Sequence, residues 1–300
     1  MGMELAALYP VARETFDEAD AVLGYKLSEL CFEGPEAQLK LTEITQPAIL
    51  TVSVAAWRVL QSKAITPSYV AGHSLGEYSA HVAAGTLSFT DAVRIVRNRG
   101  KYMQEAVPVG LGAMAAVLAL ASDKVQQICE EAAQGEVSQA ANLNSPNQTV
   151  ISGSKAAVER AAELAKKRGA KRAIMLPVSA PFHCALMQPA QDRLAEDLRA
   201  LTFHAPEIPV ICNVDAVLVT TAEQARDALI RQVTGAVQWD KSMRALAALG
   251  VQNFVEVGPG EVLCGLMRQI ARSRTCLNVE AEASLQKTVN HLSTASPKPD

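Results

Sequence analysis

The chain has 300 residues, 49% of them apolar but only 4% aromatic, and Ala, Val and Leu dominate the apolar set. This composition supports a large packed core in one or two domains and excludes a mainly disordered chain. The formal net charge of −3 excludes a global field that attracts nucleic acid, so an anionic partner must meet a local basic patch.

The first hundred residues alternate helices with one short strand. Apolar residues recur at helical spacing over residues 10–24 and 45–62, which predicts two helices, the second with Pro47 in its first turn. Residues 68–71 are predicted to form a short strand that ends in glycine, and residues 77–84 resume helical character. The segment between that strand and that helix is therefore a tight strand-to-helix turn.

The pattern changes after Pro108, which ends a helix that begins at Thr90. Six elements follow in the order strand, helix, strand, strand, helix, strand, over residues 112–118, 122–133, 137–143, 148–152, 155–169 and 172–178. This order is typical of a ferredoxin-like unit, so we expect an inserted small subdomain over residues 109–179.

The rest of the chain returns to an α/β pattern. Helices are predicted over residues 187–201, 222–233 and 239–249, and strands over residues 209–213 and 253–257. We therefore expect a fold of the α/β class with a larger subdomain built from residues 1–108 and 180–285. Residues 286–300 lack periodicity, and we expect a disordered tail there.

The strand-to-helix turn carries the pentapeptide Gly72-His73-Ser74-Leu75-Gly76. A serine on such a turn stands clear of the sheet, and flanking glycines allow the strand and helix to approach. The backbone N–H of Leu75 at the helix N-terminus is placed to donate to an oxyanion. We interpret Ser74 as the covalent nucleophile of an acyl-transfer enzyme; the alternative is a helix cap or a tight turn.

A serine nucleophile needs a base, and the chain offers five histidines: His73, His81, His183, His204 and His291. His183 is favoured because it follows a predicted strand in a loop with two prolines, which presents the ring rigidly. His73 points elsewhere on the turn, His81 lies inside a helix and His291 belongs to the predicted tail. The alternative for His183 is a histidine that serves only in packing or on the surface.

The six cysteines are scattered without a Cys-x-x-Cys pair or a metal-ligand spacing, so we expect reduced thiols and no metal site. The first residues lack the basic and apolar regions of a signal peptide, and no apolar run is long enough to span a bilayer. We expect a cytoplasmic protein without a membrane partner.

Six stretches of the chain together resemble the bacterial malonyl-CoA:acyl-carrier-protein transacylases, and the likeness runs from about residue 2 to about residue 270. The matching stretches are Ala71–Ala80, Arg99–Ala106, Asn144–Pro146, Pro181–His183, Val237–Trp239 and Glu256–Gly260. The resemblance implies an α/β-hydrolase-like large subdomain and a ferredoxin-like small one, with the active site in the groove between them.

The resemblance also implies residue roles. Ser74 is acylated, His183 is its general base and acid, and Arg99 binds the free carboxylate of the substrate. A guanidinium can hold a carboxylate through two bonds, which selects malonyl over acetyl. The backbone carbonyl at the position of Gln232 orients the histidine, which accounts for the absence of an obvious triad aspartate.

Three further residues complete the expected substrate site. Leu75 supplies its N–H, and His73 is counted with the substrate-binding residues. Phe182, beside the histidine, resembles the malonyl-accepting pattern, in which a bulky ring leaves little room for an α-methyl branch.

The implied reaction moves malonyl from malonyl-CoA to Ser74 and then to the phosphopantetheine thiol of acyl carrier protein, in fatty-acid biosynthesis. We expect no cofactor, no metal, no nucleic acid partner and a monomer. Because the carrier protein is acidic, the basic run Lys166–Arg172 is one candidate surface for it, although such runs are more often solvated helix ends.

The chain departs from the family pattern at its beginning. Family members begin with a buried strand and a Phe-Pro-Gly-Gln-Gly-Ser-Gln loop whose first glutamine helps form the oxyanion hole, and this sequence contains neither. A start site set too far downstream and a genuine loss are the two explanations. Either way we expect unpaired strand edges, an open core next to the nucleophile turn, and a chain that is unstable or weakly active.

Two other functions remain open from the sequence alone. A serine hydrolase or thioesterase would share Ser74 and His183 but would release the acid to water; Arg99 argues against it, because simple esterases need no such group. A scaffold that docks carrier protein without catalysis is the non-enzymatic alternative.

Overall fold

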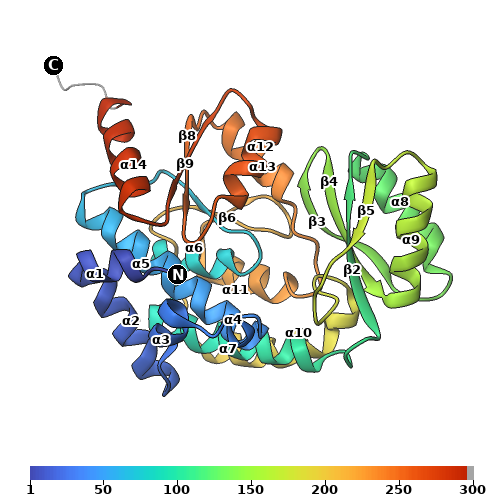
Figure 1. The fold of residues 1–300 in the computed structure, drawn as a ribbon, viewed down its shortest axis with the longest axis horizontal. Coiled ribbons are helices and arrows are strands. Elements are labelled where there is room, and N and C mark those ends of the chain that lie inside the picture. The colour runs from blue at the N-terminus through green and yellow to red at the C-terminus, as the bar shows by residue number, and fades with distance from the viewer. Residues whose placement is uncertain (296–300) are drawn as a thin grey trace.

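A computed structural model describes residues 1–295, in which helices surround two small sheets while a separate four-stranded sheet projects to one side (Figure 1). The elements of the first part are α1 (Met3–Leu8), α2 (Pro10–Leu23), α3 (Leu27–Glu33), α4 (Glu36–Leu39), α5 (Thr42–Ser62), β1 (Val70–Ala71), α6 (Gly76–Ala83) and α7 (Phe89–Glu105). No helix within residues 1–295 combines the length and apolar character needed to cross a bilayer.

Helix α5 is the central helix of this part and packs against α2 and α7. It begins at Thr42, three residues before the predicted start, so Pro47 lies inside the helix and not in its first turn. The prediction was wrong because Pro47 was used to fix the start. Burial of one long apolar face, including Leu50, Val54 and Val59, outweighs the one backbone bond that proline cannot make.

The predicted small subdomain forms with the expected element order. Its elements are β2 (Gly112–Leu118), α8 (Ser122–Ala133), β3 (Ser138–Ser145), β4 (Gln148–Ser154), α9 (Lys155–Lys167) and β5 (Arg172–Met175). The strands pair antiparallel in the order β3-β4-β2-β5, and α8 and α9 cover the outer face of the sheet (Figure 1). The opposite face packs partly against Phe182, so it faces the rest of the molecule.

The last part returns the chain to the helix-rich body. Its elements are the 3₁₀ turn η1 (Ala185–Met187), α10 (Gln188–Ala200), β6 (Val210–Ile211), β7 (Leu218–Val219), α11 (Ala222–Arg231), α12 (Trp239–Ala248), β8 (Asn253–Val257), α13 (Val262–Ile270), β9 (Thr275–Val279) and α14 (Glu282–Ala295). Strand β6 pairs parallel with β1 and antiparallel with β7, while β8 and β9 form a separate parallel pair.

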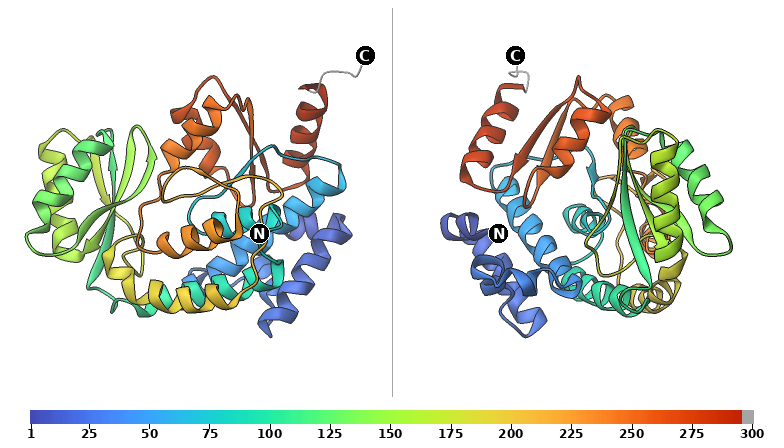
Figure 2. Two further views of the ribbon diagram at one scale, coloured as in Figure 1. Left: turned by 180° about the vertical axis from the view of Figure 1, so that it is seen from behind. Right: turned by 45° about the vertical axis from the view of Figure 1, so that its right-hand side comes forward.

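The end of the described chain differs from its predicted disorder. Residues 286–295 continue helix α14, which stands at the edge of the body beside β9 (Figure 2). Leu285 and Thr288 are fully buried and Val289 packs against the core. The spacing of these three residues is that of one face of a helix, so the sequence does contain a helical pattern here. The remainder of the predicted tail, residues 296–300, lies outside the described residues.

The cysteines also differ from the expectation of six reduced thiols. Cys264 of α13 and Cys276 of β9 form a disulfide, with their Cα atoms 5.4 Å apart. Their spacing matches no motif, because it is the packing of α13 against β9 that brings them together. The other four cysteines are free and buried.

A deep groove separates the two small sheets of the body. Within residues 1–295, β1 and β8 each have a strand partner on one side only, and both free edges line the same cavity of about 1110 Å³. Ser53 of α5, Ala80 of α6 and Leu266 of α13 are among its lining residues. Gly72 and His73 also border the groove, so it reaches the turn that carries Ser74.

Candidate active site

The turn between β1 and α6 holds Ser74 in a left-handed backbone conformation, with φ +52°. A non-glycine residue adopts this conformation at a cost of about 1–2 kcal/mol, and such residues cluster at functional sites. A Cβ atom on Gly72 would lie 1.9 Å from the carbonyl of Gly76, whereas one on Gly76 would meet no atom within 4 Å. The close approach of the strand to the helix therefore requires glycine at position 72 but not at position 76. The prediction that both glycines are needed for this approach was wrong for Gly76.

The structure brings Ser74 and His183 together. Ser74 Oγ lies 2.7 Å from His183 Nε2, and His183 Nδ1 lies 2.9 Å from the backbone oxygen of Gln232. Because a carbonyl oxygen can only accept, Nδ1 carries the proton and Nε2 is free to accept the serine proton. His183 also has a left-handed backbone, with φ +58°, so both members of the pair sit at strained positions.

His183 is buried, and its environment favours the neutral ring. Burial, together with the positive charge of Arg99, lowers the pKa of His183 to about 3. The hydrogen bond to the Gln232 carbonyl opposes this shift only in part. The imidazole is therefore a neutral base throughout the physiological pH range.

Arg99 projects from α7 into the same site and is buried. Its Nη2 donates to Ser74 Oγ at 3.1 Å and to Gln232 Oε1 at 2.9 Å, and its Nη1 donates to Gln46 Oε1 at 2.8 Å. Its Nε–H makes no hydrogen bond of ordinary geometry within residues 1–295, although the neighbouring Tyr78 side chain interacts with the guanidinium. Two of its five N–H donors are therefore left over, and a buried guanidinium of this kind, in contact with the Ser74 hydroxyl, is suited to an anionic group of a substrate.

The backbone N–H groups of Ser74 and Leu75 have different roles at the turn. The N–H of Ser74 donates to Asn213 Oδ1 at 2.7 Å and holds the turn. The N–H of Leu75 finds no acceptor in the described part of the chain and lies next to Ser74 at the start of α6. Leu75 therefore has the position of an oxyanion donor.

The two remaining predicted site residues flank the pair. His73 Nε2 lies 2.8 Å from Asn144 Oδ1 of β3, and its ring packs edge-on to Trp239 with the centroids 5.5 Å apart. His73 thus links the turn to the small subdomain. Phe182, half-buried, packs both against the large core and against the small sheet.

Sequence reasoning missed several polar residues that build this site. Gln46 holds Arg99, Asn213 clamps the turn, and Glu77 accepts from Asn213 and Gln232. For Gln232 the sequence predicts only the backbone carbonyl, and the bond from Arg99 to its side chain was missed. Asn213 had a usable signal, because it follows a predicted strand at the carboxyl end where α/β sheets place functional groups. Gln46 and Glu77 are single polar residues and carry no spacing signal.

No group of three or more His, Cys, Asp and Glu side chains within residues 1–295 could hold a metal ion. In the basic run 166–172, Lys166 is paired with Glu163 at 2.8 Å and Arg168 with Glu131, so part of its charge is neutralised within the small subdomain.

Comparisons with known proteins give a consistent result. Residues 1–295 match the model of the family described as the acyl transferase domain. The malonyl CoA-acyl carrier protein transacylase of Salmonella typhimurium is 52% identical over 283 residues, which are 94% of this chain and 92% of that protein.

Solved structures of related proteins are also similar to this chain. The malonyl CoA-acyl carrier protein transacylase of Coxiella burnetii is 45% identical with a TM-score of 0.95, and the match covers 97% of this chain and 93% of that one. A malonyl-transacylase solved in complex with its type II polyketide acyl-carrier protein is 47% identical, also with a TM-score of 0.95, over 97% and 94% of the two chains. These likenesses confirm the predicted α/β fold class with its hydrolase-like and ferredoxin-like subdomains.

Proposed function

The chain belongs to the acyl transferase domain family as a malonyl-CoA:acyl-carrier-protein transacylase, and from this premise we propose which residues carry the reaction and how. It moves a malonyl group from malonyl-CoA to acyl carrier protein in fatty-acid biosynthesis. Ser74 is the residue that holds the group between the two substrates.

The first half-reaction makes a malonyl ester of Ser74. The Ser74 hydroxyl gives its proton to His183 Nε2, 2.7 Å away, as Oγ attacks the thioester carbon. The carbonyl oxygen becomes an oxyanion, and the free N–H of Leu75 donates to it. When the carbon–sulfur bond breaks, the CoA sulfur takes the proton from His183 and CoA leaves as the thiol.

The second half-reaction repeats these steps in the opposite direction. The phosphopantetheine thiol of acyl carrier protein gives its proton to His183 Nε2, and its sulfur attacks the ester carbon. Ser74 leaves with the proton from His183, and malonyl is carried away as a thioester. No proton or electron is gained or lost overall, so the cycle needs no cofactor, and two successive half-reactions give ping-pong kinetics.

Arg99 selects the acyl group in this proposal. Its buried Nε–H makes no hydrogen bond of ordinary geometry, and the free carboxylate of malonyl supplies the missing acceptor. An acetyl group would leave that donor unsatisfied, which costs about 1–3 kcal/mol. Phe182 and His73 border the acyl site, with Phe182 restricting an α-methyl branch. We further propose that the enzyme acts as a monomer in the cytoplasm, with subdomain bounds near residues 109 and 179.

The Ser74–His183–Gln232 relay is the observation that carries the proposal. The test is intact-mass measurement after exposure to malonyl-CoA, followed by addition of acyl carrier protein. We expect one malonyl adduct that Ser74→Ala abolishes and that acyl carrier protein removes as malonyl thioester. An adduct that persists in Ser74→Ala, or that is lost only to water, would refute the proposal.

A further inference from the structure

We propose that Glu77 is a positioning residue of the active site: one oxygen of its carboxyl group holds both Asn213 and Gln232, and through them the nucleophile turn and the carbonyl that orients His183. The inference deepens the proposed function and rests on it, since it takes Ser74 and His183 as the reacting pair.

Glu77 lies in the first turn of α6, three residues after Ser74, and is fully buried. Its Oε2 accepts from Gln232 Nε2 at 2.7 Å and from the backbone N–H of Asn213 at 3.2 Å. Its Oε1 has no partner within residues 1–295. A fully buried carboxyl group is costly to desolvate, so a packing role alone would be served better by an apolar residue.

Through Asn213, Glu77 acts on the backbone of the nucleophile. With its backbone N–H held by Glu77, Asn213 uses its side chain to accept from the Ser74 N–H and to donate to the Gly72 carbonyl, each at 2.7 Å. These two bonds span the residue whose left-handed φ is costly. Glu77 therefore helps to keep Ser74 Oγ directed at His183.

Through Gln232, Glu77 acts on the other reacting groups. The same Nε2 that donates to Glu77 also donates to the Ser74 carbonyl at 2.9 Å, and Gln232 Oε1 accepts from Arg99. The backbone oxygen of Gln232 accepts from His183. Through these four contacts, Gln232 links Glu77 to His183, to Arg99 and to the turn that carries Ser74.

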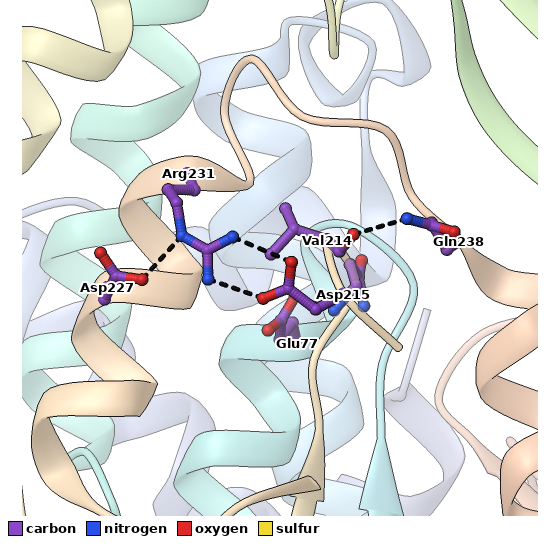
Figure 3. A network of polar contacts seen from close by, with 7 residues as sticks. Glu77, Val214, Asp215, Asp227, Arg231 and Gln238 are labelled. Atoms are coloured by element: carbon purple, nitrogen blue, oxygen red, sulfur yellow. Dashed lines mark hydrogen bonds and ion pairs between the residues drawn. The ribbon is translucent and has the colours of Figure 1, made fainter. Parts of the chain in front are cut away.

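A partly exposed ion pair joins the segment that carries Gln232 to the segment that carries Asn213. Arg231, next to Gln232, bonds both carboxylate oxygens of Asp215 at 3.0 and 2.7 Å and Asp227 at 2.6 Å, and Figure 3 shows this group beside Glu77. Asp215 lies two residues beyond Asn213, in the turn after β6. Because the pair is partly exposed, it contributes little stability, and the buried link through Glu77 sets the inner geometry.

The test measures the single-turnover rate of Ser74 malonylation by rapid-quench mass spectrometry, on variants whose folded fraction is known from circular dichroism. Glu77→Ala removes the acceptor and should slow malonylation roughly 10- to 100-fold. Glu77→Gln retains an acceptor oxygen at full reach and should recover most of the rate. Glu77→Asp keeps a carboxyl group but is one carbon shorter, so it should not recover the rate.

Asp20→Ala is the matched control. Asp20 is a buried carboxylate on α2 that accepts from the backbone N–H and the hydroxyl of Ser28, at 2.9 and 2.7 Å. It has no contact with the site. Its loss should lower the melting temperature as Glu77→Ala does but leave the malonylation rate of folded protein unchanged.

Two results would overturn the inference: folded Glu77→Ala that malonylates at the wild-type rate, or Asp20→Ala that slows malonylation as much. If Glu77→Ala does not fold, Glu77→Asp and Glu77→Gln decide, and equal rates for the two count against a positioning role. Failure of the proposed function is distinguishable, because wild-type protein would then form no malonyl-serine at all.

Discussion

We propose that the Arg99 guanidinium selects the acyl group, and this gives a prediction at the scale of a single residue. Arg99→Ala removes the charged partner of the malonyl carboxylate, so the preference for malonyl-CoA over acetyl-CoA should fall roughly 10- to 100-fold. Acylation rates with the two thioesters measure this ratio. Arg97→Ala is the control: Arg97 lies on the same helix, exposed and stacked over Tyr25, and its loss should leave the ratio unchanged. An unchanged ratio in Arg99→Ala would contradict the assignment.

The pH dependence of stability should report on Glu77. Burial raises the pKa of Glu77 to about 7, above the value of 4.5 expected in the unfolded chain. The folded state therefore binds more protons between these values, and the stabilisation present below about pH 4.5 is lost as the pH rises through about 7. The Glu77→Gln variant cannot lose stability in this way. Its free energy of unfolding, compared with that of the wild type, should therefore rise by about 2–3 kcal/mol from pH 5 to pH 7.5.

Urea unfolding at several pH values checks this difference. Glu163→Gln is the comparison, because the hydrogen bond from Lys166 lowers the pKa of exposed Glu163 and gives a slope of opposite sign. Parallel stability curves for wild type and Glu77→Gln would mean that Glu77 does not change its protonation over this range.

At the scale of elements, the crossing of β1 and α6 depends on one glycine and not on its neighbour in the motif. Gly72→Ala places a Cβ within 1.9 Å of the Gly76 carbonyl and should lower the free energy of unfolding by about 3 kcal/mol or more. Gly76→Ala meets no atom and should leave stability unchanged or raise it by about 0.5 kcal/mol. Thermal unfolding of the two variants tests the pair, and equal destabilisation would exclude this account of the turn.

Elements with a strong local pattern were predictable from the sequence, and features too short to show a pattern were not. Helix α2 and strand β8 agree with prediction to within a residue, because the spacing of their apolar residues matches one period. Strand β7 was missed because it has only two residues, too few for an alternating pattern, and the Cys264–Cys276 bond was missed because a separation of 12 positions matches no motif. The candidate site follows the same rule. Ser74 stands in a motif, whereas Glu77 becomes informative only when the fold places it against Asn213 and Gln232.

At the scale of the whole molecule, the groove between β1 and β8 leaves apolar surface open to solvent. A dye such as anilinonaphthalene sulfonate should bind the native protein there with enhanced fluorescence. Ala83→Trp, which narrows the groove from α6, should weaken the signal, while Ala248→Trp on the exposed face of α12 should not. Native protein without dye enhancement would show that the groove is closed in solution. The expectation of low stability or weak activity for this chain stays a prediction.

The inserted small subdomain has a consequence for the order in which the molecule folds. Ser74 and His183 are 109 positions apart, and the contacts that hold them span still longer separations, 141 positions from Gly72 to Asn213 and 158 from Ser74 to Gln232. Closing such loops is entropically costly, so these contacts form after the local helices and hairpins. Reactivity of Ser74 toward malonyl-CoA should therefore appear last during refolding, after the helical signal has recovered, and it marks the moment at which the chain becomes fully native.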